Sequence, residues 1–356
     1  MAFSSVRFYH FRNLVDSTVS LDAREIFLVG ENGQGKTNFL EAIYFVCYAS
    51  SFRTRRDETL VRTNAEDLAV EARFSRAGDE HVIVVKQVGR KKEIELDGKA
   101  VRDRKEIIAN VPCIVFCHDD IAFVAGAPEM QRWFMNQTLS LIEPGFVDQI
   151  RRYNRVLRAR NAALKAGQYE LLDVLDTQLV QAGAGVTERR TAITAHFSTV
   201  LADLFAAVFD SKVPLSLTYR PSWRGNDPRA QVADQRDRDI RMATTTSGPH
   251  RDRFIYALGE TELTEIASTG QLRLVSLVLR VAQARFVAEA TGAAPVLLLD
   301  DVLLELDPRR RGRFVEALPD YEQAFFTFLP DEQYARFMQK GTRIFRVQGG
   351  TIVAES

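Results

Sequence analysis

Hydrophobic and polar positions alternate along the chain in patterns that predict strands, helices and turns in an α/β order. Two short runs are apolar throughout, Ile26 to Val29 near the start and Val296 to Leu299 near the end. Continuous apolar runs of this length are typical of strands buried on both faces of a parallel sheet. A glycine-rich segment follows the first run, and the paired acids Asp300 and Asp301 follow the second. The pattern therefore predicts a parallel sheet with polar chemistry at the carboxyl ends of its strands.

Shorter, partly alternating runs follow the first of these strands and predict an antiparallel β layer. They are Leu68 to Phe74, Val82 to Gln87 and Lys92 to Leu96. Asp97-Gly98 comes directly after the last run, and this dipeptide favours a tight hairpin because it tolerates positive φ. The fold class that we expect is α/β, with this antiparallel layer as a second sheet.

A helical pattern extends from Gln131 to about Phe209, with an expected break at Gly183 to Gly185. It contains too few heptads for a long coiled coil. The next segment, Pro221 to Asp239, is rich in Arg, Asp, Gly and Pro and predicts an exposed loop. Single hydrophobic cores rarely grow beyond about 250–300 residues, so two lobes are expected. We divide the chain into the N-terminal part of an α/β lobe at 1–130, an inserted helical lobe at 131–240 and the C-terminal part of the α/β lobe at 241–356.

The composition is ordinary for a soluble globular protein, with 46% apolar and 26% charged residues. Residues 1–10 carry no signal peptide pattern, and we expect no apolar run long enough to cross a bilayer. Three cysteines cannot form a disulfide framework in 356 residues, which favours a cytoplasmic protein. Basic and acidic residues number 47 each, which excludes a globally basic nucleic-acid binder but leaves local basic patches open.

Cys113 lies inside the apolar stretch Val111 to Phe116, Cys117 closes this stretch, and His118 follows. A metal site must therefore be weighed against two cysteines that belong to a strand. The other ligands of a metal site are missing nearby, so the strand interpretation is favoured.

The glycine-rich segment after the first strand is a complete phosphate-binding loop, and a helix-forming sequence follows it. Its glycines let backbone N–H groups face the phosphates, Lys36 supplies a positive charge, and Thr37 places its hydroxyl on Mg²⁺. A chance glycine-rich turn is the alternative, and the strand–loop–helix order weighs against it. With ATP and Mg²⁺ as ligands, the predicted nucleotide-binding residues are Gly30, Glu31, Asn32, Gly33, Gln34, Gly35, Lys36, Thr37 and Asn38.

The acids after the second strand complete this site as a Walker B motif. We expect Asp300 to bind Mg²⁺ together with Thr37, and Asp301 to be the base that orients or activates water. ABC-class ATPases mostly have glutamate at the second position, and Asp301 is one methylene shorter. The sequence therefore predicts slow hydrolysis, with a turnover number that the substitution Asp301→Glu changes.

The segment from Ala267 to Gln271 precedes a helix and resembles the signature loop of ABC-class ATPases. One triphosphate needs only one anion cradle in each chain, and Lys36 already belongs to one. We therefore expect a head-to-tail homodimer, in which Ser268, Gly270 and Gln271 of one chain close over the γ-phosphate held by the other. Glu305-Leu306-Asp307 resembles the D-loop of such an interface and adds Asp307 to the site. A plain helix cap at Ser268 is the alternative.

Further segments occur in few protein families, and with them the chain specifically resembles the RecF family of bacterial recombination mediator ATPases. Walker motifs occur in many families, whereas their combination with Ser-Phe-Arg-Thr and Ser-Gly-Pro-His-Arg-Asp is narrow. The matching segments run along the whole chain and are Val6-Arg7-Phe8, Phe11-Arg12-Asn13-Leu14, Ser51-Phe52-Arg53-Thr54, Asp120 to Val124 with Gly126 and Pro128, Ser247-Gly248-Pro249-His250-Arg251-Asp252, and Leu299 to Leu303.

Three positions depart from the family pattern. Arg253 stands where a second acid usually follows Gly-Pro-His-Arg-Asp. The strand after the D-loop ends in Thr327-Phe328-Leu329-Pro330 instead of a run of threonines, which leaves the γ-phosphate switch residue unassigned. The Q-loop glutamine is not evident, and Cys117-His118-Asp119 is the corresponding turn.

The resemblance implies a weak, DNA-stimulated ATPase that dimerises on ATP and binds duplex DNA near single-strand gaps. It further implies roles in DNA repair, replication, recombination and the SOS response, with RecO and RecR as partners that load RecA. A positive helix stripe by itself is more typical of an exposed, salt-bridged face, and the resemblance favours DNA. The candidate contacts to DNA phosphates are Arg53, Arg55 and Arg56 after the first helix and Arg151, Arg155 and Arg158 at helical spacing, with Arg152 and Arg160 beside them.

Two rival functions remain at this point. A nucleotide-binding subunit of an ABC transporter would explain the nucleotide motifs, but it leaves the helical insertion and the basic stripe without a role. A non-catalytic scaffold gated by ATP is consistent with the short Asp301 and the unassigned switch residue.

Overall fold

The computed structural model describes residues 2–76, 78–108, 111–209, 211–225, 227–332 and 334–355, without the side chains of residues 304 and 305. The chain forms two compact units, one of residues 1–118 with 287–356 and one of residues 119–286. The first unit is built from both ends of the chain. The lobe boundaries that we expect from the sequence, between residues 130 and 131 and between residues 240 and 241, remain predictions.

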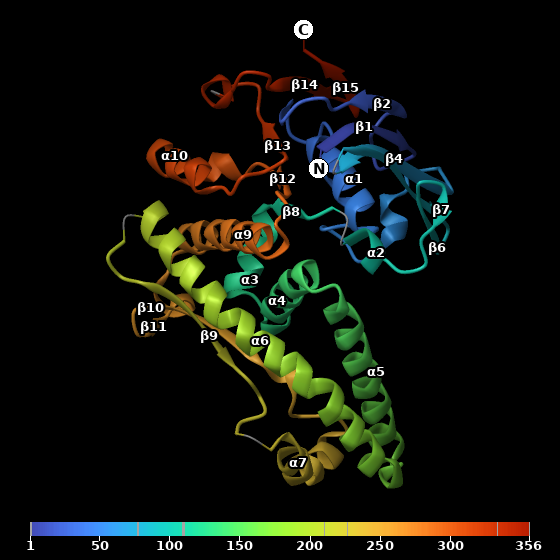
Figure 1. Ribbon diagram of the computed structural model, residues 1–356, viewed down its shortest axis with the longest axis vertical. Helices are drawn as coiled ribbons and strands as arrows, with labels where there is room; N and C mark the ends of the chain where they lie inside the picture. Colours follow the sequence, from blue (N-terminus) through green and yellow to red (C-terminus); the bar gives the residue numbers. More distant parts are fainter. Residues whose placement is uncertain are drawn as a thin grey trace. The chain divides into compact units, whose positions relative to one another are not determined.

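An antiparallel sheet forms one layer of the first unit, in the order β2-β1-β4-β5-β6-β7 (Figure 1). The three runs predicted as strands lie within β4, β5 and β6, which confirms the antiparallel layer. Asp97 and Gly98 have φ values of 50° and 74°, as a tight hairpin with two positive φ angles requires. The strands are β1 Ala2–Tyr9, β2 Ser17–Ser20, β4 Asp67–Arg76, β5 Asp79–Val88, β6 Lys91–Leu96 and β7 Lys99–Ala100.

The second sheet of this unit is mostly parallel, in the order β15-β14-β3-β13-β12-β8. Every residue of β3 and β12 is buried, which confirms the two continuous apolar runs as central strands. Cys113 is buried in β8, and the described residues hold no group of three or more His, Cys, Asp or Glu suited to a metal. The strands are β3 Glu25–Val29, β8 Cys113–Phe116, β12 Val296–Leu299, β13 Gln323–Phe328, β14 Arg343–Gln348 and the antiparallel β15 Thr351–Ala354.

Helix α1, Lys36–Tyr48, contacts β4 and β5 of the first sheet and β8 and β13 of the second. Because it lies between two sheets, nearly all of its side chains are buried, and its sequence is apolar around most of its circumference. The other helical segments of the first unit are η1 Asp57–Leu60, α2 Lys105–Ile108, η5 Val302–Glu305, α10 Pro308–Ala317 and η6 Tyr334–Phe337.

The second unit is largely helical, and α5 and α6 pack side by side in it (Figure 1). A small antiparallel sheet, β11-β10-β9, accompanies the helices. The elements are η2 His118–Ile121, α3 Ala122–Ala125, α4 Pro128–Ile142, α5 Gly145–Ala166, η3 Tyr169–Leu171, α6 Leu172–Phe209, β9 Leu215–Arg220, α7 Pro228–Met242, η4 Pro249–Arg251, β10 Arg253–Leu258, β11 Thr261–Glu262, α8 Leu263–Ile266 and α9 Thr269–Thr291, which begins in this unit.

The helix break expected at Gly183 to Gly185 is wrong, because α6 is continuous through these residues. A Cβ atom on Gly183 would lie 2.5 Å from the ring of Trp223 and 3.1 Å from that of Tyr153. The glycine therefore permits close packing of the helix instead of ending it. The chain turns at Gly167, which caps α5 with a φ of 71°.

The exposed loop expected over 221–239 is also wrong in its second half, where α7 forms. Asp227 caps this helix by accepting hydrogen bonds from the backbone N–H groups of Arg229 and Ala230. Pro228 occupies the first turn, where its missing N–H group costs nothing. The segment has the polar composition of a loop, but its N-terminal cap and proline allow a helix to form.

One helical stretch of the described chain, Tyr169–Phe209, is long and apolar enough to cross a membrane by length and composition alone. This differs from the expectation that no such run exists. Its apolar side chains Phe197, Leu201, Leu204 and Val208 recur at helical spacing and are buried within the protein. Core helices of soluble proteins pass the same test of length and composition, so the stretch is weak evidence for a membrane.

Candidate functional site

The phosphate-binding loop joins the carboxyl end of β3 to the N-terminus of α1. Gly33 and Gly35 have φ values of 77° and 120°, and a Cβ atom on Gly30 would collide with the carbonyl oxygen of Val347. Lys36 is only 4% exposed, and its Nζ donates to the carbonyl oxygens of Gly30 at 2.7 Å and Glu31 at 3.2 Å. The ammonium group of Lys36 thus lies within the curved backbone of the loop, where the motif predicts that phosphate binds.

Segments far away in the sequence brace this loop. The backbone N–H groups of Gly350 and Gly349 donate to the carbonyl oxygen and to Oε1 of Gln34, at 2.8 and 2.6 Å. Nδ2 of Asn38, the next helix residue but one after Lys36, donates to Oδ1 of Asn13 at 2.7 Å. The sequence did not indicate these contacts, because they join residues that are at least 25 positions apart in the chain.

The Walker B acids lie next to the loop. The hydroxyl of Thr37 donates to Oδ1 of Asp300 at 2.8 Å. Burial first, and then the neighbouring Asp301 carboxylate, raises the pKa of Asp300 to about 6, while the Thr37 hydrogen bond acts in the opposite direction. A hydroxyl and a carboxylate at this distance are the hard oxygen ligands that Mg²⁺ prefers, so the predicted magnesium ligands fit that ion.

Asp301 occupies the left-handed region with a φ of 53°, which is uncommon for a residue other than glycine. Its backbone N–H donates to Oγ1 of Thr327 at 2.7 Å, and the same hydroxyl lies 2.7 Å from Oδ1 of Asp301. Thr327, at the end of β13, therefore fixes the conformation of the candidate base. Strained backbone of this kind is concentrated at functional sites.

The signature-like segment opens α9. Ser268 Oγ accepts from the backbone N–H of Gln271 at 3.3 Å, and Gln271 Oε1 accepts from the backbone N–H of Ser268 at 2.8 Å. This is a capping box, so the plain-cap interpretation describes the isolated chain. Ser268, Gly270 and Gln271 are exposed, and a Cβ atom on Gly270 would meet open space. The segment remains accessible to a second molecule, and its contact with nucleotide stays a prediction.

Asp307 is exposed and caps α10, where it accepts from the backbone N–H groups of Arg309 and Arg310. The side chain of Glu305 in the same D-loop-like segment lies outside the described residues. A role of Asp307 at a dimer interface therefore stays a prediction.

The first predicted DNA cluster divides into two environments. Arg53 Nη1 donates to Oδ1 of Asn38 at 2.8 Å and lies 3.5 Å from the buried Glu41 carboxylate, which Arg12 also binds. Arg53 is thereby held beside the phosphate-binding loop. Arg55 and Arg56 are exposed on the following segment.

The second predicted DNA cluster lies on α5. Arg151, Arg155 and Arg158 are exposed, as a surface stripe requires, and Arg151 forms an ion pair of 3.6 Å with Asp148. Arg160 does not belong to the stripe. It is fully buried and binds the carboxylates of Asp176 and Asp239 at 2.5 and 2.7 Å together with the hydroxyl of Thr245.

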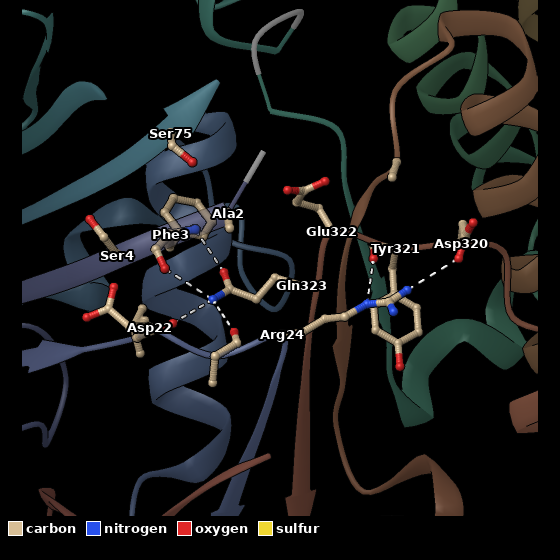
Figure 2. A pocket seen from close by; sticks show the side chains of 13 residues that line it. Ala2, Phe3, Ser4, Asp22, Arg24, Ser75, Asp320, Tyr321, Glu322 and Gln323 are labelled. Atoms are coloured by element: carbon tan, nitrogen blue, oxygen red, sulfur yellow. Dashed lines mark hydrogen bonds and ion pairs between the residues drawn. The ribbon is translucent and has the colours of Figure 1, made fainter. Parts of the chain in front are cut away.

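A hollow of about 680 Å³ lies elsewhere on the first unit, at the amino ends of β3 and β13 (Figure 2). Gln323 lies at its centre, where its side-chain Nε2 donates to the carbonyl oxygens of Phe3 and Leu21. Arg24 on its wall forms an ion pair with Asp320. Ligands of open α/β sheets bind at the carboxyl ends of the parallel strands. This hollow lies at the amino ends and is therefore separate from the predicted nucleotide site.

One acid near the nucleotide site was missed in the sequence. Glu332 follows β13 in a turn, where its Oε1 accepts from the backbone N–H of Leu329 at 3.1 Å. Its Oε2 is buried and has no hydrogen-bond partner among the described residues. Neither a motif nor periodicity marks this position.

Comparisons with known proteins match this chain over nearly its full length. Residues 2–353 match the family described as the RecF/RecN/SMC N-terminal domain. The protein named DNA replication and repair protein RecF from Treponema pallidum (strain Nichols) is 39% identical, over 96% of this chain and 98% of that protein. Its namesake from Synechococcus sp. (strain JA-2-3B'a(2-13)) is 30% identical, over 99% and 97%. A solved structure described as the recombination mediator protein RecF-ATP in the RecFOR pathway has a TM-score of 0.91 and 24% identity, over 100% of this chain and 98% of that one.

Proposed function

The chain belongs to the RecF family, and from this premise we propose that it is an ATP-dependent DNA-binding protein of recombinational repair and replication. ATP and Mg²⁺ are its ligands, and ATP joins two chains on duplex DNA near single-strand gaps. RecO and RecR are its partners and RecA the protein loaded, in the cytoplasm. The name of the RecF-ATP structure in the RecFOR pathway supports the nucleotide and the partners.

The observation that carries the proposal is the junction of the two nucleotide motifs. Thr37 and Asp300 meet at 2.8 Å, beside a buried Lys36 whose Nζ is held within the phosphate-binding loop. Lys36 binds the β- and γ-phosphates, Thr37 and Asp300 hold Mg²⁺, and Asp301 orients the attacking water. Bound Mg²⁺ supplies charge stabilisation to the phosphoryl oxygens.

The nucleotide is enclosed only when a second chain closes over it. Ser268, Gly270 and Gln271 are exposed at the N-terminus of α9, where the helix dipole favours an anion. Each chain offers one such terminus and one phosphate-binding loop, so two chains related by a two-fold axis complete two identical sites.

The transporter alternative is not favoured, because relatives that match nearly the whole chain are named as repair proteins. A scaffold gated by ATP without hydrolysis differs from our proposal only in turnover. Weak, DNA-stimulated hydrolysis is our choice, because both acids of the Walker B motif are present, with Asp300 bound by Thr37 and Asp301 bound by Thr327.

Analytical sedimentation tests the proposal. Wild-type chain is compared with ATP and with ADP, each with and without gapped duplex DNA, and Lys36→Met is run in parallel with phosphate release measured. We expect a dimer on DNA with ATP but not with ADP. We also expect slow phosphate release that DNA accelerates. A chain that stays monomeric with a non-hydrolysable analogue and DNA contradicts the proposal, and a dimer without phosphate release favours the scaffold.

A further inference from the structure

Glu332 lies between the two halves of the nucleotide site. Strand β13 is flanked by β3, which leads into the phosphate-binding loop, and by β12, which leads into the Walker B acids. The carbonyl oxygen of Phe328 at the end of β13 accepts from the backbone N–H of Gly30 at 3.2 Å. Glu332 belongs to the turn that starts one residue later, so the topology brings this acid to the carboxyl edge of the sheet.

The turn presents only one of the two carboxylate oxygens to the protein. Glu332 N donates to the carbonyl oxygen of Leu329 at 3.2 Å, and Leu329 N donates to Oε1 of Glu332 at 3.1 Å. Oε2 is buried and unpartnered among the described residues. Leaving a buried polar atom without a partner is unfavourable, so Oε2 is suited to a donor that arrives with a ligand.

The charged groups that act on Glu332 include two residues of the site, Lys36 and Asp301. Burial first raises the pKa of Glu332; the Asp301 carboxylate acts in the same direction, whereas the Leu329 hydrogen bond and the charges of Arg311 and Lys36 oppose it. A carboxylate with a raised pKa is a better proton acceptor near neutral pH. The charges of Lys36 in the loop and of Asp301 in the Walker B motif thus act on this carboxylate in opposite directions.

Asp301 by itself is poorly suited to take a proton from water. Its side chain is one methylene shorter than glutamate, and its Oδ1 is engaged by the hydroxyl of Thr327 at 2.7 Å. The left-handed backbone of Asp301 and its N–H bond to Thr327 fix the residue in this orientation. It can orient a water molecule, but the proton needs a second acceptor.

We propose that Glu332 is a further catalytic residue for ATP hydrolysis, whose Oε2 accepts the proton of the attacking water. This inference rests on the proposed function. The water oxygen forms a bond to the γ-phosphorus, and the bond from that phosphorus to the β–γ bridging oxygen breaks. Its electron pair leaves with ADP, and the proton of the water passes to Glu332. Protonated Glu332 then returns this proton to solvent after phosphate departs.

Glu332→Gln separates this role from a structural one. Glutamine keeps a carbonyl oxygen that accepts from Leu329 N, so the turn is preserved while the proton acceptor is lost. We expect single-turnover hydrolysis to fall by about 100-fold, as is typical for the loss of a general base. Nucleotide affinity and ATP-dependent dimerisation should remain within about twofold, because no ground-state contact is removed. The exposed neighbour Asp331→Asn is the matched control, and we expect it to hydrolyse ATP at the wild-type rate.

The double substitution with Asp301→Asn provides a second readout. Two acids that act on one water should show strongly non-additive losses, so the double variant should be little slower than Glu332→Gln alone. Glu332→Gln with wild-type hydrolysis, or with a loss of ATP binding as large as its loss of hydrolysis, overturns the inference. Wild-type chain that fails to bind ATP overturns the proposed function itself, which distinguishes the two failures.

Discussion

The hydroxyl of Thr37 donates a hydrogen bond of 2.8 Å to Oδ1 of Asp300, although 263 positions separate the two residues. Thr37 is the second residue of α1, which follows β3, and Asp300 follows β12. Strand β13 lies between these two strands in the sheet, so the bond joins segments that follow two non-adjacent strands. The two residues expected to share a magnesium ion therefore meet at one edge of the sheet.

Lys36→Met should weaken ATP binding by about 10- to 100-fold, because a hydrogen bond to a charged group contributes about 1.5–3 kcal/mol. Equilibrium titration with a fluorescent ATP analogue measures the loss. Lys340→Met, an exposed lysine near the C-terminus, is the control and should bind like wild type. Equal affinity of Lys36→Met and wild type would contradict the assignment of the loop.

A head-to-tail dimer predicts complementation between two inactive chains. Lys36→Met removes the phosphate contact, and Ser268→Arg blocks the exposed cap that closes over the partner's nucleotide. A mixed dimer keeps one intact site, formed by Lys36 of the second chain and Ser268 of the first. Mixing should restore up to about half of the wild-type hydrolysis per dimer, by the symmetry of the pair. If the mixture remains as inactive as each variant alone, the two residues do not share a site.

Hydrolysis by the wild-type chain should be slow, well below the median of about 10 per second for enzymes. Asp301 is short, and Thr327 holds its carboxylate. Asp301→Glu should raise the turnover number by about tenfold, since the longer side chain reaches further toward the water. Steady-state phosphate release on gapped DNA is the measurement. A wild-type rate near the median, or a turnover number insensitive to this substitution, would refute the interpretation.

Arg155→Glu with Arg158→Glu should reduce ATP-dependent DNA binding and leave nucleotide affinity unchanged. Both side chains are exposed on α5, and contacts to phosphates weaken steeply with salt. Anisotropy of labelled duplex across a salt series should show a loss of about tenfold or more and a shallower salt slope. Arg238→Glu with Arg241→Glu on α7 changes the charge equally and serves as the control. DNA binding that is unaltered by the α5 reversal removes this surface from the proposal.

Protonation of His250 should destabilise the protein in acid. Its Nε2 lies 3.0 Å from the carbonyl oxygen of Thr245, which can only accept, so Nε2 carries the proton and Nδ1 accepts from the Tyr153 hydroxyl at 2.6 Å. Burial lowers the pKa of His250 to about 4, below its unfolded value of about 6.5. Between these two pH values the unfolded chain binds more protons than the folded one. The contribution of neutral His250 to the free energy of unfolding is therefore fully present above about pH 6.5 and is lost as pH falls toward 4.

The expected loss for His250 is on the order of 2–3 kcal/mol across this window. Urea unfolding at pH 7 and pH 4.5 measures it, and His250→Gln should flatten the difference. His81, which is paired with Asp97 on the antiparallel sheet, is the matched control site. The same pH dependence in wild type and His250→Gln would show that other groups govern acid stability.

Gly183→Ala should cost about 1–3 kcal/mol, because the added methyl group would lie 2.5 Å from the Trp223 ring and overpack the helix. Gly145→Ala at the start of α5 meets open space and should leave stability nearly unchanged. Thermal and urea unfolding compare the two variants. A neutral effect at Gly183 would mean that Trp223 moves aside freely.

Much of the candidate site could be predicted because its signals are local. Gly33 and Gly35 of the loop have positive φ values, and Asp300 directly follows a strand whose residues are all apolar. The antiparallel layer was equally visible, since period-two runs and the Asp97-Gly98 turn are short-range features. Helix α7 escaped prediction because its cap and proline lie within a segment of loop-like composition.

The sequence by itself therefore determined the nucleotide motifs, the α/β class and the family resemblance, because each depends on the order of residues along one stretch of chain. Only the tertiary structure decided which arginines are available. Arg158 and Arg160 are two positions apart on α5, yet one is exposed and the other is buried between two carboxylates. It also placed Glu332 in the turn after β13, the strand between those that lead to Lys36 and to Asp301. The phase of a helix and the stacking order of strands set these relationships, and both are fixed by packing between residues far apart in sequence.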